Sequence, residues 1–276
     1  MALDRVVGSP PKIEMIAGGF TFTEGPVFSR IGFLLYTDVL AERARILRWE
    51  NGKVMPFREN SNRASGLTFD HQGRLLTCER DRVTRTEKDG SITVLASTFE
   101  GKPLLSPNDL VYAIDGSIYF SVLKPRTIDG PERPAIYQIA RNGQLRLATR
   151  ECTRPNGVAL APNQQRLFAT DTEQRNVRVF DISGDGSLKS GRVFCQLKGD
   201  ARGGPGGLKT DESGNVWVAG PGGIWVFDAA GEHMGTIALP ETPSNCTWGA
   251  GFRNLYVTAV TSIYRIETKV NGTRTY

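Results

Sequence analysis

Hydrophobic and polar residues form a repeating pattern along the chain, in which a polar turn leads into an apolar strand and a second apolar strand follows. The turn with its first strand occurs at residues 21–28, 62–70, 105–112, 153–160, 203–211 and 243–250. The second strand occurs at residues 33–38, 74–79, 117–122, 166–171, 215–220 and 254–259. A period of roughly 40–50 residues is typical of the blades of a propeller rather than of separate domains. The pattern therefore predicts six blades.

Further strands complete most of these repeats. Third strands are expected at residues 45–49, 82–86, 135–139, 177–181, 224–228 and 262–266, and outer strands at 53–58, 92–97, 145–150, 192–197 and 236–239. The sixth repeat has no outer strand downstream, and residues 13–17 (IEMIA) are its simplest partner. This pairing would remove two open sheet edges. We therefore expect an all-β, six-bladed β-propeller over residues 1–276, a single domain closed by the N-terminal strand; a β-sandwich would not explain six equivalent openings.

Composition restricts the partners and the location. The net charge of +5 is spread over turns and forms no basic stripe with interleaved aromatic residues, so nucleic acid is not an expected partner. The N-terminal residues lack a signal-peptide pattern, and no apolar stretch is long enough to cross a membrane, so we expect a cytoplasmic protein. The four cysteines share no close spacing, which argues against a CxxC zinc or redox site and favours buried, reduced thiols. The oligomeric state is not determined by the sequence.

The polar turns that enter the innermost strands of a propeller face one central channel. The residues in these turns are Glu24, Ser65, Asn108, Asn156, Gly206 and either Asn245 or Thr247. A carboxylate and two carboxamides are hard oxygen donors, which suit Ca²⁺ better than a zinc site of His and Cys. A single asparagine in a turn often only bonds its own backbone. Three polar residues at equivalent places favour a shared site.

Several of these segments resemble one known family. The runs EGPVF (24–28), SPNDLVY (106–112), RPNGVAL (154–160) and PSNCTWGA (243–250) are similar to the SMP-30/gluconolactonase/LRE family of six-bladed propellers, and the likeness extends from about Phe22 to Ile266. The resemblance implies hydrolysis of sugar lactones, other lactones or organophosphate-like esters with one divalent cation, most often Ca²⁺. It also implies the metal ligands Glu24, Asn108 and Asn156. The alternatives Mn²⁺, Mg²⁺ and Zn²⁺, and a weak or absent ion, stay open.

The sequence departs from the family where a second carboxylate is expected. The family has PDG where this chain has Pro205, Gly206 and Gly207, so the aspartate that usually binds metal and serves as base or nucleophile is a glycine. Glu24 could act as the base if the ion were weak or absent, because desolvation raises the pKa of a channel carboxylate. Asp171 and Asp200 are the other catalytic candidates, each with a structural or solvated alternative.

Candidate substrate-binding residues lie in or near the channel turns. They are Arg63, Ser65, Arg80, Asn108, Arg154 and Trp248. The guanidinium groups could hold a carboxylate or a hydroxyl-rich ligand at two points, or form surface ion pairs. Trp248 could stack on a sugar ring or seal the channel floor. His71 and His233 lie in polar turns and are not expected to be catalytic bases.

Three classes of function remain open for a small-molecule substrate or ligand. The first is a divalent-metal-assisted lactone hydrolase of the gluconolactonase type. The second is a non-hydrolytic enzyme, an isomerase, lyase or condensing enzyme, with a rebuilt, metal-poor pocket that uses Glu24 as acid and base. The third is a non-catalytic binding propeller. Position 206 distinguishes them, because an ordinary member of the family would carry aspartate there.

Overall fold

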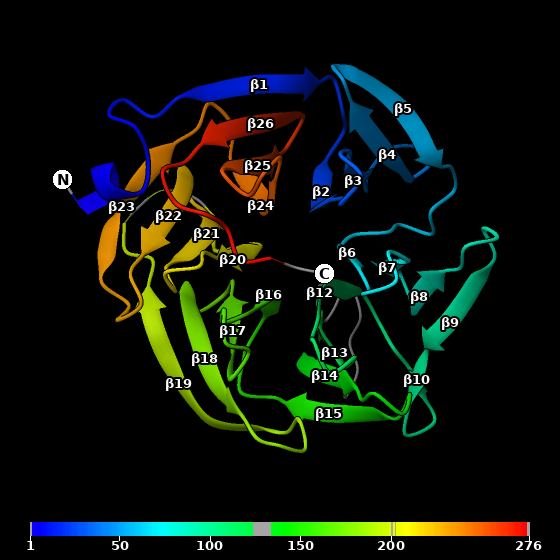
Figure 1. The fold of residues 1–276 in the computed structure, drawn as a ribbon. Helices are drawn as coiled ribbons and strands as arrows, with labels where there is room; N and C mark the ends of the chain where they lie inside the picture. Colours follow the sequence, from blue (N-terminus) through cyan, green and yellow to red (C-terminus); the bar gives the residue numbers. More distant parts are fainter. Residues whose placement is uncertain (1, 124–133, 200, 202, 275–276) are drawn as a thin grey trace.

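The computed structural model describes residues 2–123, 134–199, 201 and 203–274, and these form a ring of six four-stranded antiparallel sheets (Figure 1). Blade 1 contains β2 (Thr23–Phe28), β3 (Leu34–Asp38), β4 (Arg45–Glu50) and β5 (Lys53–Arg58). Blade 2 contains β6 (Leu67–Phe69), β7 (Leu75–Cys78), β8 (Val83–Thr86) and β9 (Ile92–Ala96). Blade 3 contains β12 (Pro107–Tyr112), β13 (Ile118–Val122), β14 (Ala135–Ile139) and β15 (Leu145–Thr149).

The second half of the ring repeats this arrangement. Blade 4 contains β16 (Pro155–Leu160), β17 (Arg166–Asp171), β18 (Asn176–Ile182) and β19 (Leu188–Gln196). Blade 5 contains β20 (Leu208–Thr210), β21 (Val216–Gly220), β22 (Gly223–Phe227) and β23 (His233–Ala238). Blade 6 contains β24 (Pro243–Gly249), β25 (Asn254–Ala259), β26 (Ser262–Glu267) and β1 (Ile13–Gly18). The prediction of a six-bladed, all-β propeller is confirmed.

Elements outside the regular strand order are short. A 3-10 helix (Ala2–Arg5) precedes β1, and the hairpin of β10 (Thr98–Phe99) and β11 (Lys102–Pro103) connects blades 2 and 3. Strand β1 pairs antiparallel with β26, with Ile13 opposite Ile266. Blade 6 therefore combines strands from both ends of the chain.

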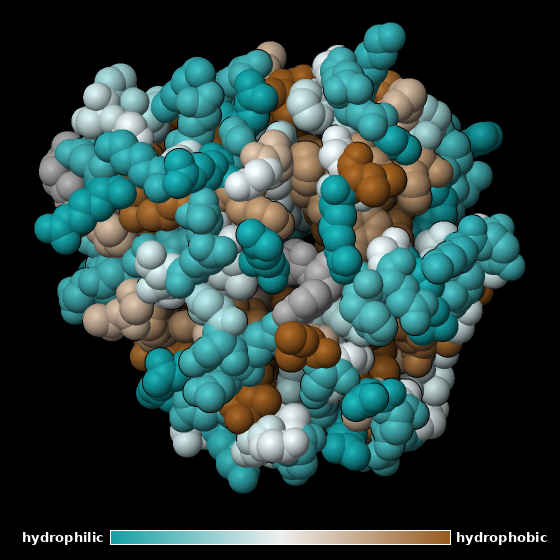
Figure 2. All heavy atoms as spheres, viewed as in Figure 1, coloured by the Kyte–Doolittle hydropathy of each residue, from teal (hydrophilic) through white to brown (hydrophobic). Residues whose placement is uncertain are grey.

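The core lies between neighbouring blades. Second strands such as β3 and β21 are buried along their whole length and are mainly apolar, whereas an outer strand such as β5 is mostly exposed. Between blades 5 and 6, Trp217 packs edge-on against Trp248 with ring centroids 5.1 Å apart. All four cysteines are unpaired and buried, as expected for core thiols. Figure 2 shows a face covered mainly by hydrophilic side chains, with hydrophobic residues scattered among them. No helix among the described residues is long and apolar enough to cross a membrane.

Hydroxyl groups on the second strands connect each of three blades to the channel turn of the next. The Oγ1 of Thr37 donates to the Ser65 carbonyl (3.2 Å), and the Oγ of Ser121 donates to the Asn156 carbonyl (2.5 Å). The Oγ1 of Thr170 donates to the Gly206 carbonyl (2.7 Å) and accepts a bond from the Gly157 amide (2.8 Å). The residue types at the ends of these buried strands therefore fix the positions of the channel turns.

Replacing Thr170 with valine is expected to destabilise the protein by about 2–4 kcal/mol, because the buried Gly206 carbonyl and Gly157 amide both lose their partner while the volume is kept. Thr170→Ser keeps the hydroxyl and should cost less than about 1.5 kcal/mol. Urea unfolding of the two variants measures the difference. Equal stability of the two variants would contradict this role of the hydroxyl.

The C-terminal segment crosses one face of the ring and approaches the middle of it (Figure 1). The Thr273 amide donates to the Thr210 carbonyl (3.0 Å), and Gly272 forms a bridge with Asp211. Beneath the segment is a small cavity of about 30 Å³, which Lys209 and Trp248 help to line. The segment therefore covers the end of the inner strands in blades 5 and 6.

Candidate functional site

The channel turns share a local irregularity of the backbone. The pairing of the inner strand with its neighbour shifts register between Glu24 and Val27, between Pro107 and Leu110, between Pro155 and Val158, and between Pro243 and Asn245. Such bulges release one or two residues from the ladder and redirect their side chains. The prolines in EGP, PND, PNG and PSN suit these positions, because proline lacks the N–H that a regular ladder requires. The sequence thus places Glu24, Asn108 and Asn156 at equivalent bulges of three blades.

Glu24 is buried and held from two sides. Its Oε2 accepts hydrogen bonds from the Gly25 amide (2.9 Å) and from the Nδ2 of Asn245 (3.2 Å). Burial raises the pKa of Glu24 to about 7, against the lowering effect of the Gly25 hydrogen bond, and the nearby Asp109 carboxylate adds to the rise. The other carboxylate oxygen, Oε1, makes no hydrogen bond within the described part of the chain. Near neutral pH this group is therefore poised to hold either a proton or a cation.

Asn108 and Asn156 are half-buried, and each is oriented by its amide nitrogen. The Nδ2 of Asn108 donates to the Oγ of Ser65 (3.3 Å), and the Nδ2 of Asn156 donates to the Oγ1 of Thr172 (3.3 Å). The Thr172 hydroxyl in turn donates to the Pro205 carbonyl (2.7 Å). With the nitrogens engaged, the amide oxygens are the atoms left to bind a ligand. Ser65 therefore positions Asn108, as well as standing in a channel turn itself.

These donors fit a hard divalent cation. Three oxygen atoms from three blades, one of them a carboxylate, are ligands of the kind that Ca²⁺ accepts together with water. The described residues contain no group of three or more His, Cys, Asp and Glu side chains that could hold a metal. The chemistry of the donor set therefore favours Ca²⁺ over a softer ion such as Zn²⁺.

At Gly206, the channel turn of blade 5 contributes backbone and no side chain. The Gly206 amide donates to the Ala219 carbonyl (2.8 Å), as the Ser65 amide donates to the Cys78 carbonyl (2.9 Å) in blade 2. A Cβ atom at Gly206 would overlap the carbonyl oxygen of Ser244. Because position 206 is a glycine, the turn of blade 6 can approach the turn of blade 5 closely.

Two further charged residues belong to this region, the buried Asp109 and the half-buried Lys209. Neither is among the site residues predicted from the sequence. Asp109 is only 3% exposed and accepts a hydrogen bond from the Val158 amide (3.2 Å). Burial raises the pKa of Asp109, whereas the positive charge of Lys209 and a hydrogen bond from Asn245 lower it. Asn245 therefore connects the carboxylates of Glu24 and Asp109. The sequence feature that could have identified Asp109 is its place next to Asn108 in a bulge, because consecutive side chains in a bulge can face the same region.

The carboxylate of Asp171 accepts hydrogen bonds from the backbone of a turn. Its Oδ2 accepts from the Thr153 amide (2.5 Å), and its Oδ1 accepts from the amides of Arg154 (3.0 Å) and Gln174 (3.3 Å). These bonds fix the segment that leads to Asn156. We therefore assign Asp171 a positioning role rather than the catalytic one considered from the sequence.

Asp171→Asn is expected to lower stability by about 2 kcal/mol, because an amide NH₂ would face backbone N–H donors. Catalytic activity should fall by less than about tenfold, whereas loss of a general base costs roughly 10²–10⁴-fold. Thermal unfolding and kcat of the purified variant test both expectations. A loss of kcat above about 100-fold in a protein of unchanged stability would restore Asp171 as a base.

The other residues predicted for substrate binding or catalysis differ in their exposure to solvent. Arg63 and Arg80 are exposed, and Arg63 lines an open cavity of about 540 Å³ between blades 1 and 2. Arg154 is half-buried next to Asn156. Asp200 lies outside the described residues.

Trp248 is packed in the core between blades 5 and 6. It is 5% exposed, its Nε1 donates to the Thr210 carbonyl (2.8 Å), and it packs between Trp217 and Gly272. Of the two roles considered from the sequence, sealing the channel floor fits this position, and stacking on a sugar does not.

The sequence and the fold have counterparts among known proteins. A gluconolactonase of Zymomonas mobilis is 27% identical in an alignment that is 309 positions long and covers 98% of this chain and 85% of that protein. The solved structure of XC5397, a gluconolactonase of Xanthomonas campestris, is 29% identical with a TM-score of 0.88, covering 97% of this chain and 92% of that one. Regucalcin of Agrobacterium tumefaciens, a calcium-binding protein, is 17% identical and shares the fold, with a TM-score of 0.82 over 97% and 96% of the two chains. The family model of the SMP-30/gluconolactonase/LRE-like region matches residues 22–261. This chain belongs to the SMP-30/gluconolactonase/LRE-like family.

Proposed function

We propose that this protein is a divalent-metal-assisted hydrolase of lactones, with a small sugar-acid lactone or related cyclic ester as substrate. The observation that carries the proposal is the set of oxygen donors of Glu24, Asn108 and Asn156 at equivalent bulges of three blades. The gluconolactonases among its relatives support the same reaction class.

Each residue of the pocket has a distinct task in this proposal. Glu24, Asn108 and Asn156 would hold the ion, which when bound would polarise the lactone carbonyl and stabilise the negative charge that develops on its oxygen. Asn245 keeps Glu24 in place, and Asp109 keeps Asn245 in place. In the absence of a cation, Glu24 can accept a proton from water near neutral pH, because its pKa is about 7.

Two observations favour a second candidate function. Gly206 supplies no carboxylate, and the pKa of Glu24 lies near neutrality, which is suited to acid–base chemistry without a metal. A non-hydrolytic enzyme using Glu24 as acid and base is therefore the alternative.

A pH-indicator assay on glucono-1,5-lactone and on a series of aliphatic and aromatic lactones tests the proposal. Parallel reactions contain EDTA, Ca²⁺, Mn²⁺ or Zn²⁺. Hydrolysis that EDTA abolishes and Ca²⁺ restores supports it. Hydrolysis equal to the buffer rate on every lactone and with every ion would overturn it.

In metal-free protein, stability should fall as the pH rises from about 4.5 to about 7. The pKa of Glu24 is raised from its ordinary value of 4.5, so in this range the folded protein holds a proton that the unfolded chain has lost. Deprotonation therefore favours unfolding, by roughly 3 kcal/mol over the whole range. Urea unfolding in EDTA, compared between wild type and Glu24→Gln, measures this contribution. An identical pH dependence in both proteins would contradict it.

A further inference from the structure

A further cavity lies apart from the channel turns, between blades 2 and 3. Its volume is about 430 Å³, which is within the range of small-molecule sites. It is lined by the turns that follow β6, β12 and β14, together with residues of β7, β8, β9, β12, β13 and β14. None of the proposed metal ligands contributes to it. The cavity is therefore a candidate site that lactone hydrolysis does not use.

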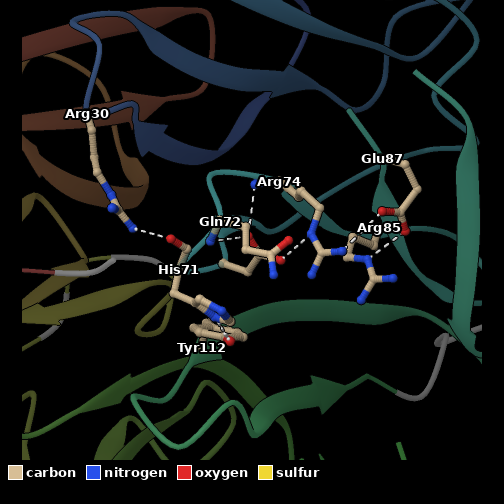
Figure 3. A network of polar contacts seen from close by, with 8 residues as sticks. Arg30, His71, Gln72, Arg74, Arg85, Glu87 and Tyr112 are labelled. Carbon is tan, nitrogen blue, oxygen red and sulfur yellow. Dashed lines mark hydrogen bonds and ion pairs between the residues drawn. The ribbon is translucent and has the colours of Figure 1, made fainter. Parts of the chain in front are cut away.

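One part of the lining is apolar. It is formed by side chains from adjacent sheets, Leu76, Leu95, Ile118 and Ile139. Tyr112 adds an aromatic face, and the Nδ1 of His71 lies 2.5 Å from its hydroxyl oxygen (Figure 3). The cavity can thus accept an apolar or aromatic body.

Two arginines of blade 2 are held rigidly at the cavity. The Nε of Arg74 bonds Asp70 (2.7 Å), and its Nη1 lies 3.2 Å from Glu87. The Nε of Arg85 bonds the other oxygen of Glu87 (2.7 Å). Figure 3 shows that the terminal nitrogens of Arg85 lie on the side away from Glu87. Within the described residues, no acceptor bonds these nitrogens or the Nη2 of Arg74.

The carboxylates at the cavity are already engaged. The Oδ1 of Asp70 accepts from the amides of Gln72 and Arg74 (2.9 Å each), and its Oδ2 accepts from the Arg74 side chain. Asp115 accepts from the amide (2.8 Å) and the hydroxyl (3.1 Å) of Ser117. The exposed Arg141 adds a positive charge from blade 3. The carboxylate oxygens are therefore engaged in hydrogen bonds within their own turns and in ion pairs. Guanidinium N–H groups remain to donate hydrogen bonds to a ligand.

We propose that this cavity binds a small organic anion, in which a carboxylate or phosphate group meets Arg85 and Arg141 and an apolar body contacts the isoleucine and leucine wall. Planar guanidinium groups bind both kinds of oxyanion by charge-assisted hydrogen bonds. The site is independent of the proposed lactone chemistry, and its occupant need not be a substrate.

Isothermal titration calorimetry with benzoate and phenyl phosphate tests the site, with benzamide as the neutral analogue. We expect at least one anion to bind, and benzamide to bind more than about tenfold more weakly. Arg85→Gln and Arg141→Gln should each weaken anion binding by about tenfold. Arg146→Gln removes the same charge from the neighbouring strand β15 but lies outside the cavity lining, so it should bind as wild type does.

The possible results distinguish a carboxylate site from a phosphate site, and this cavity from the channel. Tighter binding of benzoate or of phenyl phosphate identifies the head group. Arg141 is exposed, so its variant should fold even if Arg85→Gln does not, and circular dichroism checks both. The proposal is overturned if neither anion binds the folded wild type at millimolar concentration, if benzamide binds equally well, or if Arg141→Gln binds as tightly as Arg146→Gln. Binding lost only on adding Glu24→Gln would place the anion in the channel instead.

Discussion

Replacing Glu24 with glutamine is expected to lower kcat/KM for lactone hydrolysis by at least about 100-fold. Glu24 is the carboxylate of the three proposed ligands, so the variant loses the negative charge that holds the cation. It also loses the group whose pKa lies near neutrality. The measurement is the pH-indicator assay at saturating Ca²⁺, together with a calcium titration of each protein.

Glutamine preserves the volume and can still accept from the Gly25 amide and from Asn245, so the fold should be retained. Glu50→Gln is the matched control, because Glu50 lies on β4 and pairs with Arg48 (2.7 Å), away from the channel turns. The control should keep activity within about twofold, since surface changes of this kind have small effects. Full activity of Glu24→Gln would exclude Glu24 as both ligand and base.

Introducing an aspartate by Gly206→Asp, at the position where the resemblance to the family implies one, is expected to destabilise the protein by about 3 kcal/mol and to leave activity unimproved. The new Cβ would overlap the Ser244 carbonyl oxygen, so the blade 6 turn must move. Ser244 precedes Asn245, which holds Glu24, and the movement would therefore disturb the proposed ligand as well. Gly206→Ala should cost about as much, because the overlap arises at Cβ. Urea unfolding and lactonase assays with and without Ca²⁺ give both quantities.

Gly184→Ala is a suitable control, because no atom lies within 4 Å of a Cβ built there. Its stability should stay within about 0.5 kcal/mol of wild type. The opposite result, a stable Gly206→Asp protein with a large Ca²⁺-dependent gain in activity, would show that the pocket readily accepts a fourth ligand. It would also mean that the glycine, rather than the rest of the pocket, limits the natural protein.

The positions of Asp109 and Trp248 depend on the tertiary structure. Asp109 is not among the site residues predicted from the sequence, yet it is buried and shares Asn245 with Glu24. The sequence leaves two roles open for Trp248, and its packing in the core against Trp217 fits the sealing of the channel floor. Both positions are set by contacts between blades, which depend on residues far apart in the chain.

The sequence by itself determined the six repeats and the positions of the channel turns, because strand alternation and turn chemistry are local properties read within one blade. It also placed Glu24, Asn108 and Asn156 at equivalent turns, where the bulges follow from the prolines and glycines beside them. Only the tertiary structure decided which atoms meet across the ring. Packing of blade 6 against blade 5 brings the Ser244 carbonyl onto Gly206 and Asn245 onto Glu24, and packing of blade 3 against blade 2 forms the arginine-lined cavity. These contacts depend on the angle and spacing between neighbouring sheets, which the pattern of any single repeat does not contain.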